Sequence, residues 1–199
     1  MKKENNIHPT FDQLLTRNQK EALLKQKSKV IWLTGLSGSG KTTVANAFER
    51  KLFQEGFFTN ILDGDNIRTG INNNLGFSEE DRIENIRRIA EVAKLFMDSG
   101  VITICCFVSP TKEIREQAKS IVGTNDFIEV FVNTPIAICE QRDVKGLYAK
   151  ARKGEIKNFT GIDAPFEAPT ENFIDLKTEN QTIAQTADNL YRNIIAHLK

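Results

Sequence analysis

A glycine-rich octapeptide, Gly35–Thr42, has the composition and spacing of a loop that binds phosphate. Its residues, Gly-Leu-Ser-Gly-Ser-Gly-Lys-Thr, fit the pattern G-x-x-x-x-G-K-[ST] without a mismatch. The glycines let successive backbone N–H groups converge on phosphate oxygens, Lys41 adds a cation for the β- and γ-phosphates, and Thr42 offers a hydroxyl to Mg²⁺. This phosphate loop predicts a nucleoside triphosphate site with Mg²⁺, formed by Gly35, Leu36, Ser37, Gly38, Ser39, Gly40, Lys41, Thr42 and Thr43.

Two aspartates, Asp63 and Asp65, follow the apolar run Phe57–Leu62, with Gly64 between them to permit a tight bend. In a parallel α/β sheet, ligands bind beyond the carboxyl ends of the strands, so both carboxylates should face the phosphate loop. One carboxylate can accept a hydroxyl proton while the other holds Mg²⁺ through water. The alternative is an Asp-Gly turn with two solvated acids.

A long amphipathic helix is predicted from Ser78 to about Ser99, and it carries Arg82 within its apolar arc and Asn85 at the edge of that arc. A guanidinium turned inward needs a partner, because an unpaired buried charge is costly. That partner is either a carboxylate of the protein or an anion delivered by substrate, which arginine binds well. Arg68 would be a second anchor for an anion. Phe77 would offer a stacking face or simply pack at the start of the helix.

Two further segments are candidates for the site. Ser109-Pro110 follows the apolar run Val101–Val108, and its serine could contact phosphate or cap the next helix, capping being the default. Residues 142–157 contain six Lys and Arg against two acids, a local balance of +4. This stretch is either a solvated basic loop or a lid that excludes water from phosphoryl transfer.

The elements that position these residues alternate between strands and helices. We predict helices at 11–27, 42–53, 78–99, after Pro110, at 135–142 and at 182–198, the last with a capping box at Thr182 and Gln185. Short apolar runs predict strands at 29–34, 57–62, 101–108, 127–132 and 173–176. The alternation favours an α/β fold in three layers, a parallel sheet with helices on both faces, as in phosphate-loop NTPases. We expect a single domain over 1–199, with a leader and helix at 1–27 and a lid at about 145–169.

Composition limits the class of protein. The chain has 199 residues, of which 40% are hydrophobic and 27% charged, with a net charge of +1, which argues against a protein that coats nucleic acid or an anionic membrane. No signal peptide or membrane span is visible, so we expect a cytoplasmic protein. The three cysteines have no metal or CxxC spacing, and buried hydrophobic roles are expected for Cys105 and Cys106.

The phosphate loop by itself does not specify the reaction. The chain lacks the Asn-Lys-x-Asp sequence of a guanine-reading GTPase, and its size disfavours a mechanical ATPase. A small-molecule kinase is therefore the favoured class. Two alternatives are a kinase for another acceptor, such as a nucleoside monophosphate or a sugar acid, and an ATP-binding module that has lost catalysis.

Several longer segments resemble the adenylylsulfate kinase family. They are Trp32–Lys41, Leu62–Arg68, Leu75–Ser78, Asp81–Lys94, Lys145–Tyr148 and Phe159–Asp163, together with the leader around His8-Pro9-Thr10. The resemblance covers most of the chain. It implies transfer of phosphate from ATP to the 3′-hydroxyl of adenosine 5′-phosphosulfate (adenylyl sulfate), giving 3′-phosphoadenylyl sulfate in sulfate assimilation, by an enzyme that is a homodimer.

The resemblance also implies roles for residues. Asp63 would be the base, and Lys145 would lie near the transferred charge together with Lys41 of the phosphate loop. Of the two aspartates, Asp65 is then the one predicted to hold Mg²⁺ with Thr42. For Ser109, a contact with substrate is the preferred role. A phosphoserine intermediate is the second choice, because direct in-line transfer needs no covalent step. The acceptor would be bound by Asp63, Asp65, Arg68, Phe77, Arg82, Asn85, Val108, Ser109, Lys145, Gly146, Leu147 and Phe159.

Two departures from the family pattern stand out. Thr111 and Lys112 replace the usual Tyr-Arg after Ser-Pro, which puts a contact near the acceptor in question, whereas Arg115 keeps its place. Asn133 stands where Asp is usual.

Overall fold

The core of the protein is a parallel five-stranded sheet. The computed structural model describes residues 8–199, so the start of the predicted leader lies outside the described residues. The strand order is β2-β3-β1-β4-β5. The central strand β1 and its neighbour β3 are fully buried because helices cover both faces. The strands are β1 (Val30–Thr34), β2 (Thr59–Asp63), β3 (Ile102–Cys106), β4 (Phe127–Asn133) and β5 (Phe173–Lys177).

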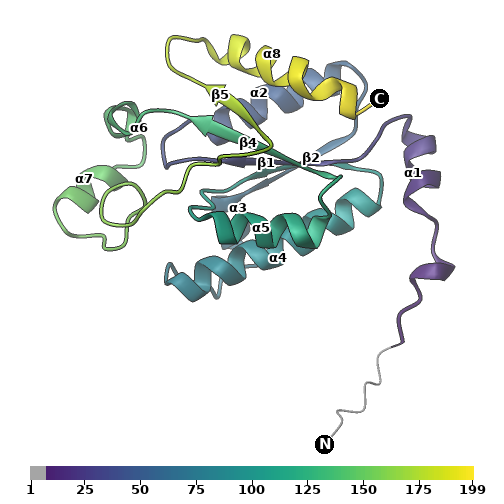
Figure 1. Cartoon of the computed structure of the whole chain (residues 1–199), viewed down its shortest axis with the longest axis horizontal. Helices are drawn as coiled ribbons and strands as arrows, with labels where there is room; N and C mark the ends of the chain where they lie inside the picture. The colour runs from purple at the N-terminus through teal and green to yellow at the C-terminus, as the bar shows by residue number, and fades with distance from the viewer. Residues whose placement is uncertain (1–7) are drawn as a thin grey trace, which may run out of the picture.

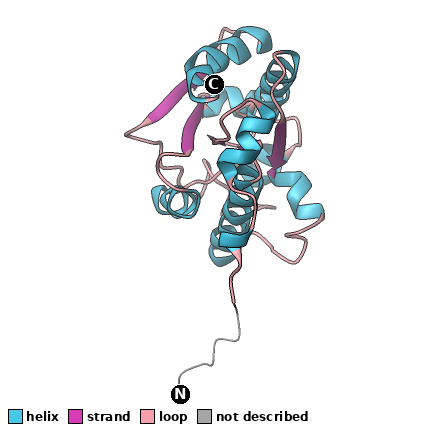
Figure 2. Cartoon of the chain, turned by 90° about the vertical axis from the view of Figure 1, so that its right-hand side faces the viewer, coloured by secondary structure: helices cyan, strands magenta, loops and turns pink. Residues whose placement is uncertain are grey.

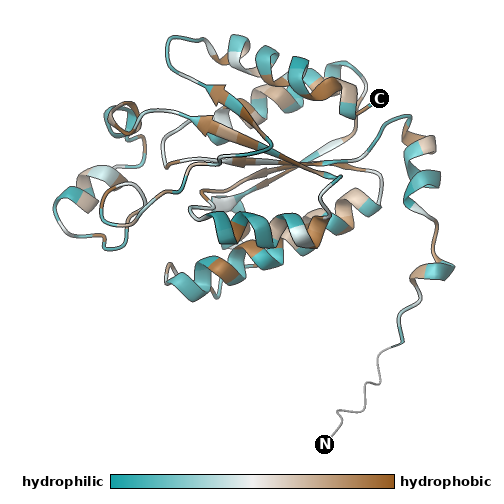
Figure 3. Cartoon of the chain, in the orientation of Figure 1, coloured by the Kyte–Doolittle hydropathy of each residue, from teal (hydrophilic) through white to brown (hydrophobic). Residues whose placement is uncertain are grey.

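Helices form a layer on each face of this sheet (Figure 1). On one face, α2 (Lys41–Gln54) and α8 (Ile183–Ile194) pack over Ile31, Leu33 and their neighbours. On the other, α4 (Glu79–Asp98) and α5 (Lys112–Val122) pack over Trp32 and Cys105. Apolar residues lie in the strands and on the inward sides of the helices (Figure 3). This is the three-layer α/β fold that the alternating pattern predicts. All three cysteines are free and buried.

The N-terminal helix is shorter than the predicted range 11–27, so that prediction is wrong in its length. A short 3₁₀ turn (Phe11–Gln13) precedes α1 (Arg17–Leu24), and Leu14 and Leu15 between them are 58% and 66% exposed. The helix starts late because Thr16 forms a capping box with Gln19, which satisfies the first amides of α1. This helix lies across the amino-terminal side of the sheet and faces the viewer in Figure 2.

Two short helices lie in segments that were predicted as turn or loop. Asp63 accepts hydrogen bonds from the backbone of Asp65 and Asn66, so the Asp-Gly-Asp turn continues into α3 (Gly64–Thr69). The expected loop at 145–169 contains α7 (Leu147–Arg152). The capping box predicted at Thr182 and Gln185 is confirmed, although α8 ends in a 3₁₀ turn at Ile195–His197.

The carboxyl ends of the strands share one edge, as parallel pairing requires. The phosphate loop, α6 (Ile136–Arg142), α7 and the segment after it lie at this edge, on the side opposite α1 (Figure 1). Across residues 8–199, no helix combines the length and apolar character needed to cross a membrane. The topology therefore gathers at one edge residues that are more than a hundred positions apart in the chain.

Candidate active site

The phosphate loop runs from β1 to α2 in a conformation that its glycines make possible. Gly38 and Gly40 have φ of +73° and +102°, which side chains other than glycine rarely adopt. A Cβ on Gly35 would lie 2.7 Å from the carbonyl oxygen of Val132, and one on Gly38 would lie 2.9 Å from that of Cys139. The loop thus needs glycine for both backbone shape and close packing against β4 and α6.

Lys41 lies at the first turn of α2, with its side chain folded over the loop. Its Nζ donates hydrogen bonds to the carbonyl oxygens of Gly35 at 2.9 Å and Leu36 at 2.8 Å. Burial lowers the pKa of Lys41 to about 8. A nearby phosphate would favour the charged form, so the ammonium is placed where an anion offsets the cost of its burial.

Thr42 and Asp63 form the contact between the phosphate loop and β2. The Thr42 hydroxyl donates to Asp63 Oδ2 at 2.7 Å, while Oδ1 accepts from the Asp65 amide at 3.0 Å. Asp63 is only 8% exposed. These hard oxygen donors suit Mg²⁺, which usually binds one or two carboxylates together with substrate phosphates. Residues 8–199 contain no group of three or more His, Cys, Asp or Glu that would form a metal cage.

Asp65 points away from that contact. Its carboxylate forms an ion pair with Lys145, which precedes α7. Both side chains are more than half exposed, so solvent screens the pair and its contribution to stability is small. The pair nevertheless brings the cation predicted to act on the transferred charge next to the acidic turn. The assignment of Asp65 to Mg²⁺ stays a prediction, and Asp63 is the carboxylate that contacts Thr42.

Arg68, Phe77 and Arg82 form a cluster beyond the acidic turn. The Arg68 guanidinium lies over the Phe77 ring, 4.5 Å from its centroid. Arg82 donates to the Phe77 carbonyl at 3.0 Å, to Thr160 Oγ1 at 2.9 Å and to the Asn158 carbonyl at 2.7 Å. Burial and the neighbouring charge of Arg82 lower the pKa of Arg68.

No carboxylate of the described residues forms a salt bridge with either arginine of this cluster. The sequence left open whether Arg82 pairs with a carboxylate, and the structure gives it only neutral oxygens of the segment 158–160 and of Phe77. Two guanidinium groups held together by carbonyls attract an anion. The arrangement therefore favours the anion-binding interpretation.

A cavity of about 800 Å³ joins the phosphate loop to this arginine cluster. Asn85, 4% exposed, also borders it and accepts a hydrogen bond from Asn72. The predicted site residues that line the cavity are Ser37, Gly38, Gly40, Lys41, Thr42, Thr43, Asp63, Asp65, Arg68, Phe77, Arg82, Asn85, Val108, Ser109, Lys145, Leu147 and Phe159. Gly35, Leu36, Ser39 and Gly146 do not line it; the first three shape the phosphate loop, and Gly146 is the N-cap of α7.

Comparison with known proteins identifies the family. The profile of the family described as adenylylsulphate kinase matches residues 27–177. A curated adenylyl-sulfate kinase of Bacteroides fragilis is 62% identical over 195 residues, which cover 98% of this chain and 96% of that protein. The chain belongs to the adenylylsulphate kinase family. A Clostridium acetobutylicum adenylyl-sulfate kinase is 53% identical over 183 residues, or 92% of this chain and 91% of that protein.

A solved member of the adenylylsulphate kinase family has the same fold. The structure of the Mycobacterium tuberculosis APS kinase in complex with AMPPNP and APS superposes with a TM-score of 0.82 at 45% identity. The alignment covers 85% of this chain and 98% of that one. The fold class and family predicted from the sequence are therefore confirmed.

The lid segment, residues 145–169, packs against the phosphate loop. The Tyr148 hydroxyl donates to the Ser37 carbonyl at 2.9 Å, and the Tyr148 ring meets Phe159 edge-on at a centroid distance of 5.0 Å. A Cβ on Gly161 would lie 2.9 Å from Leu36. The segment is thus docked on the loop, and Tyr148, only 1% exposed, is its buried anchor.

The two departures from the family pattern have local structural roles. Thr111 caps α5 by accepting from the Ile114 amide, and the Lys112 amide donates to Glu167 at 2.7 Å, which ties the end of the lid segment to α5. Asn133 donates to Asp175 on β5 at 2.9 Å. Helix capping at this point comes from Thr111, whereas Ser109 lies in the cavity wall.

Sequence reasoning missed one end of the cavity. Arg142 donates to the Ser39 carbonyl at 3.2 Å and to Thr178 Oγ1 at 3.3 Å, which joins the phosphate loop to the β5–α8 connection. Arg142 belongs to the basic stretch 142–157, but no motif around it in the sequence marks it as a contact of the phosphate loop. The other lining residues of this end are Thr178, Gln181, Ile183 and Thr186.

Proposed function

We propose that this chain transfers the terminal phosphoryl group of ATP to the 3′-hydroxyl of adenylyl sulfate, giving ADP and 3′-phosphoadenylyl sulfate. One observation carries the proposal: a single cavity has the phosphate loop on one side, the arginine cluster on the other, and Asp63 between them. The family supports the choice of acceptor, since the relatives are adenylyl-sulfate kinases and the Mycobacterium tuberculosis structure contains APS.

Two ends of the cavity suit two ligands. The end lined by Arg142, Thr178 and Ile183 lies beyond the phosphate loop and would hold the base and ribose of ATP. The end lined by Arg68, Phe77 and Arg82 offers cations for a phosphosulfate and aromatic faces for an adenine, with Phe159 as a second face. A volume of about 800 Å³ is of the size that small-molecule sites have.

Asp63 is the proposed general base. Its Oδ1 is engaged by the amides that begin α3, so the proton of the 3′-hydroxyl would pass to Oδ2. Although Oδ2 accepts from Thr42, a carboxylate oxygen has a second lone pair. The burial of Asp63 fixes its direction, and positioning of this kind supplies much of the rate enhancement in phosphoryl transfer.

Lys41 and the loop amides would carry the charge of the transferred group. The ammonium is held 2.9 Å from the Gly35 carbonyl, at the mouth of the loop, and Lys145 lies across the acidic turn. Thr42 and Asp65, the pair that the sequence predicts, would hold Mg²⁺, while Asp63 is bonded to the Thr42 hydroxyl. The ion, when bound, neutralises phosphate charge. We rank Ser109 as a contact for the ligands, and its phosphorylation remains a prediction.

The decisive experiment measures ADP release with a panel of acceptors. We expect selective turnover with adenylyl sulfate and none with nucleoside monophosphates or sugar acids. Turnover with another acceptor would support a different kinase, and ATP binding without turnover on any acceptor would indicate a module that has lost catalysis. We further propose a homodimer in the cytoplasm, without nucleic-acid or membrane partners. Cell fractionation tests that location.

A further inference from the structure

Ser109 has a backbone conformation that its residue type does not favour. Its φ is +43°, in the left-handed region, and it is the residue before a proline. It is 2% exposed, and it is one of the residues that line the cavity described above. Surrounding contacts must hold such a residue in place, and conformations of this kind gather at functional sites.

Three side chains hold Ser109. Trp32 Nε1 on β1 donates to the Ser109 hydroxyl oxygen at 2.9 Å. Arg115 Nη1 on α5 donates to the Ser109 carbonyl at 2.9 Å, and the Thr34 hydroxyl lies 3.3 Å from the same carbonyl. The contacts come from β1 and α5, so they fix both the backbone and the side chain of this residue.

The indole of Trp32 is itself immobilised. Trp32 is fully buried, and its ring lies against Phe107 and Phe127 at centroid distances of 5.5 Å each. An indole N–H can only donate, so the Ser109 oxygen must be the acceptor of this bond. Among the described residues, the Ser109 hydroxyl has no acceptor for its own proton. That proton is therefore available to an acceptor in the cavity that Ser109 lines.

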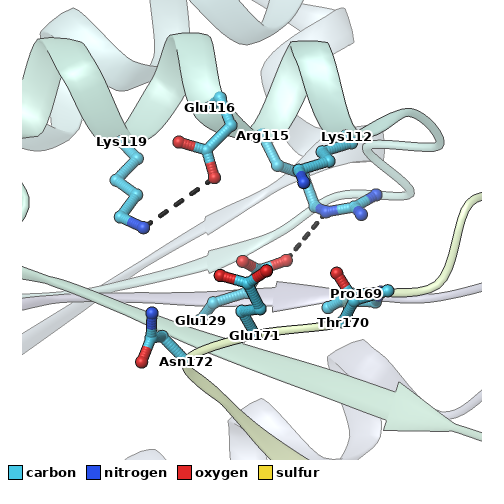
Figure 4. Close-up of a pocket in the computed structure, with 9 residues that line it drawn as sticks. All are labelled: Lys112, Arg115, Glu116, Lys119, Glu129, Pro169, Thr170, Glu171 and Asn172. Atoms are coloured by element: carbon cyan, nitrogen blue, oxygen red, sulfur yellow. Dashed lines mark ion pairs between the residues drawn. The ribbon is translucent and has the colours of Figure 1, made fainter.

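Arg115 is held by a buried ion pair. Its Nε lies 2.8 Å from Glu129 Oε1 on β4, and the two side chains are 3% and 9% exposed. Figure 4 shows Arg115 reaching from α5 to Glu129. They border a separate cavity of about 330 Å³, which none of the predicted site residues lines. Because an unpaired charge here would be costly, Glu129 keeps the guanidinium at Ser109.

We propose that Trp32 and Arg115 are positioning residues that hold Ser109 as a hydrogen-bond donor to an anionic oxygen of the bound ligands. Trp32 occupies the acceptor side of the hydroxyl, and Arg115 holds the carbonyl that keeps the residue left-handed. A donor role needs no base beside Ser109, whereas a nucleophile would need one. The inference rests on the proposed kinase function for its ligands, but not for its geometry.

A spectroscopic experiment tests the contact itself. The chain has one tryptophan, so a ¹⁵N-labelled sample gives one indole N–H resonance. Ser109→Ala should move that resonance upfield, as expected when a hydrogen bond is lost. Ser120→Ala, at an exposed serine on α5 that donates to the Gln117 carbonyl, is the matched control and should not move it. An indole resonance that is the same in Ser109→Ala and wild type would overturn the proposal.

A double-mutant cycle then tests positioning in catalysis. Trp32→Phe removes the donor but keeps an aromatic ring, and should lower kcat/KM for adenylyl sulfate by about three- to tenfold, the range for one hydrogen bond. In a Ser109→Ala background the same change should have no further effect. Equal losses in both backgrounds would mean that Trp32 is merely structural. Ile194→Ala, in the core on the other face of the sheet and away from Trp32, should lower the melting temperature with no comparable loss of kcat/KM.

A second variant keeps the test open if Trp32→Phe does not fold. Arg115→Lys keeps a positive charge beside Glu129 but cannot reach both Glu129 and Ser109, so kcat/KM should fall in wild type and not in Ser109→Ala. An unchanged kcat/KM would remove Arg115 from the proposal. Failure of wild type to use adenylyl sulfate would contradict the proposed function, while the indole resonance would still decide the contact.

Discussion

Asp63 combines three tasks at one position: it ends β2, caps α3 and contacts Thr42. Asp63→Asn keeps an oxygen that can accept the α3 amides, but loses the charge and the basicity. We expect kcat to fall at least about a hundredfold, the scale of general base catalysis, with nearly unchanged ATP affinity. A coupled kinase assay and calorimetry with an ATP analogue measure the two quantities. Wild-type turnover in this variant would disprove the base assignment.

Arg82 makes three hydrogen bonds that link α4 to the lid segment and to Phe77. If Arg82 binds the acceptor, Arg82→Ala should raise KM for adenylyl sulfate by about tenfold or more, because hydrogen bonds to charged groups are the stronger ones. KM for ATP should stay within about twofold of the wild-type value. Arg87→Ala, on the same helix but paired with Glu84 at the surface, is the control. Equal rises in both KM values would indicate a structural role.

At the scale of elements, α7 reaches the phosphate loop through one hydroxyl. Tyr148→Phe removes only the hydrogen bond to the Ser37 carbonyl and keeps the buried ring. We expect KM for ATP to rise about threefold to tenfold, since the loop carbonyl loses the donor that orients it. Tyr191→Phe on α8, the other tyrosine of the chain, is the matched control. Steady-state kinetics at varied ATP measure this KM. Equal values of KM for ATP in Tyr148→Phe and Tyr191→Phe would contradict a role of the Tyr148 hydroxyl at the phosphate loop.

Helix α1 is attached to the sheet by a charged network. Arg17 bridges Glu21 at 2.8 Å and Asp126 at 2.6 Å. Burial raises the pKa of each acid, but hydrogen bonds to the carboxylates outweigh this effect. Glu21 accepts from Ser28 and Arg17, and Asp126 accepts from Arg17 and Lys29. The pKa values of Glu21 and Asp126 therefore lie below the usual 4.5 and 3.8. An acid whose pKa is lower in the folded chain stabilises the fold at a pH above its ordinary pKa. That stabilisation is lost as the pH falls through the pKa of the folded state.

Thermal melting from pH 7 downward tests this network. Glu21→Gln should melt below wild type at pH 7. The difference in melting temperature should shrink below about pH 4.5, because Glu21 of the unfolded chain then takes up a proton while folded Glu21 still holds its charge. Glu80→Gln, at an exposed position of α4, should show no such pH-dependent difference. If the difference in melting temperature between Glu21→Gln and wild type stays constant down to pH 2, the charge of Glu21 does not contribute to stability.

For the whole molecule, the N-terminal segment exposes large apolar side chains. Phe11, Leu14, Leu15 and Leu23 are 58–82% exposed, which is costly for a lone chain. If the proposed homodimer covers them, sedimentation should give about twice the chain mass of 22.5 kDa. Leu23→Glu should then shift the equilibrium to monomer, and Ile71→Glu, at an exposed site away from this segment, should not. A wild-type monomer at micromolar concentration would contradict the dimer.

The net charge of +1 is an average over an uneven surface. Lys41, Arg68, Arg82, Arg142 and Lys145 all line one cavity, so the molecule is close to neutral overall and cationic inside. This distribution suits small polyanions that enter a cleft and does not suit long polymers that bind a surface.

The local sequence determined the strands, most of the helices and the phosphate loop. Buried β-strands require apolar runs, and a loop that wraps phosphate requires glycine at set positions, so both leave a signal within a few residues. Arg82 was expected inward because its place in the helical period is local information. The short helices α3 and α7 were missed because each is about one turn and a half long, where capping contacts decide the outcome.

Only the tertiary structure decided which of these residues meet. The contact of Trp32 with Ser109 spans 77 positions, and that of Tyr148 with Ser37 spans 111. Such pairs depend on strand order and on the docking of the lid segment, and neither depends on any local pattern. The same holds for the partner of Arg82. Its sequence position left a carboxylate of the protein and an anion of the substrate both open, and its contacts with the neutral oxygens of residues 158–160 favour the anion.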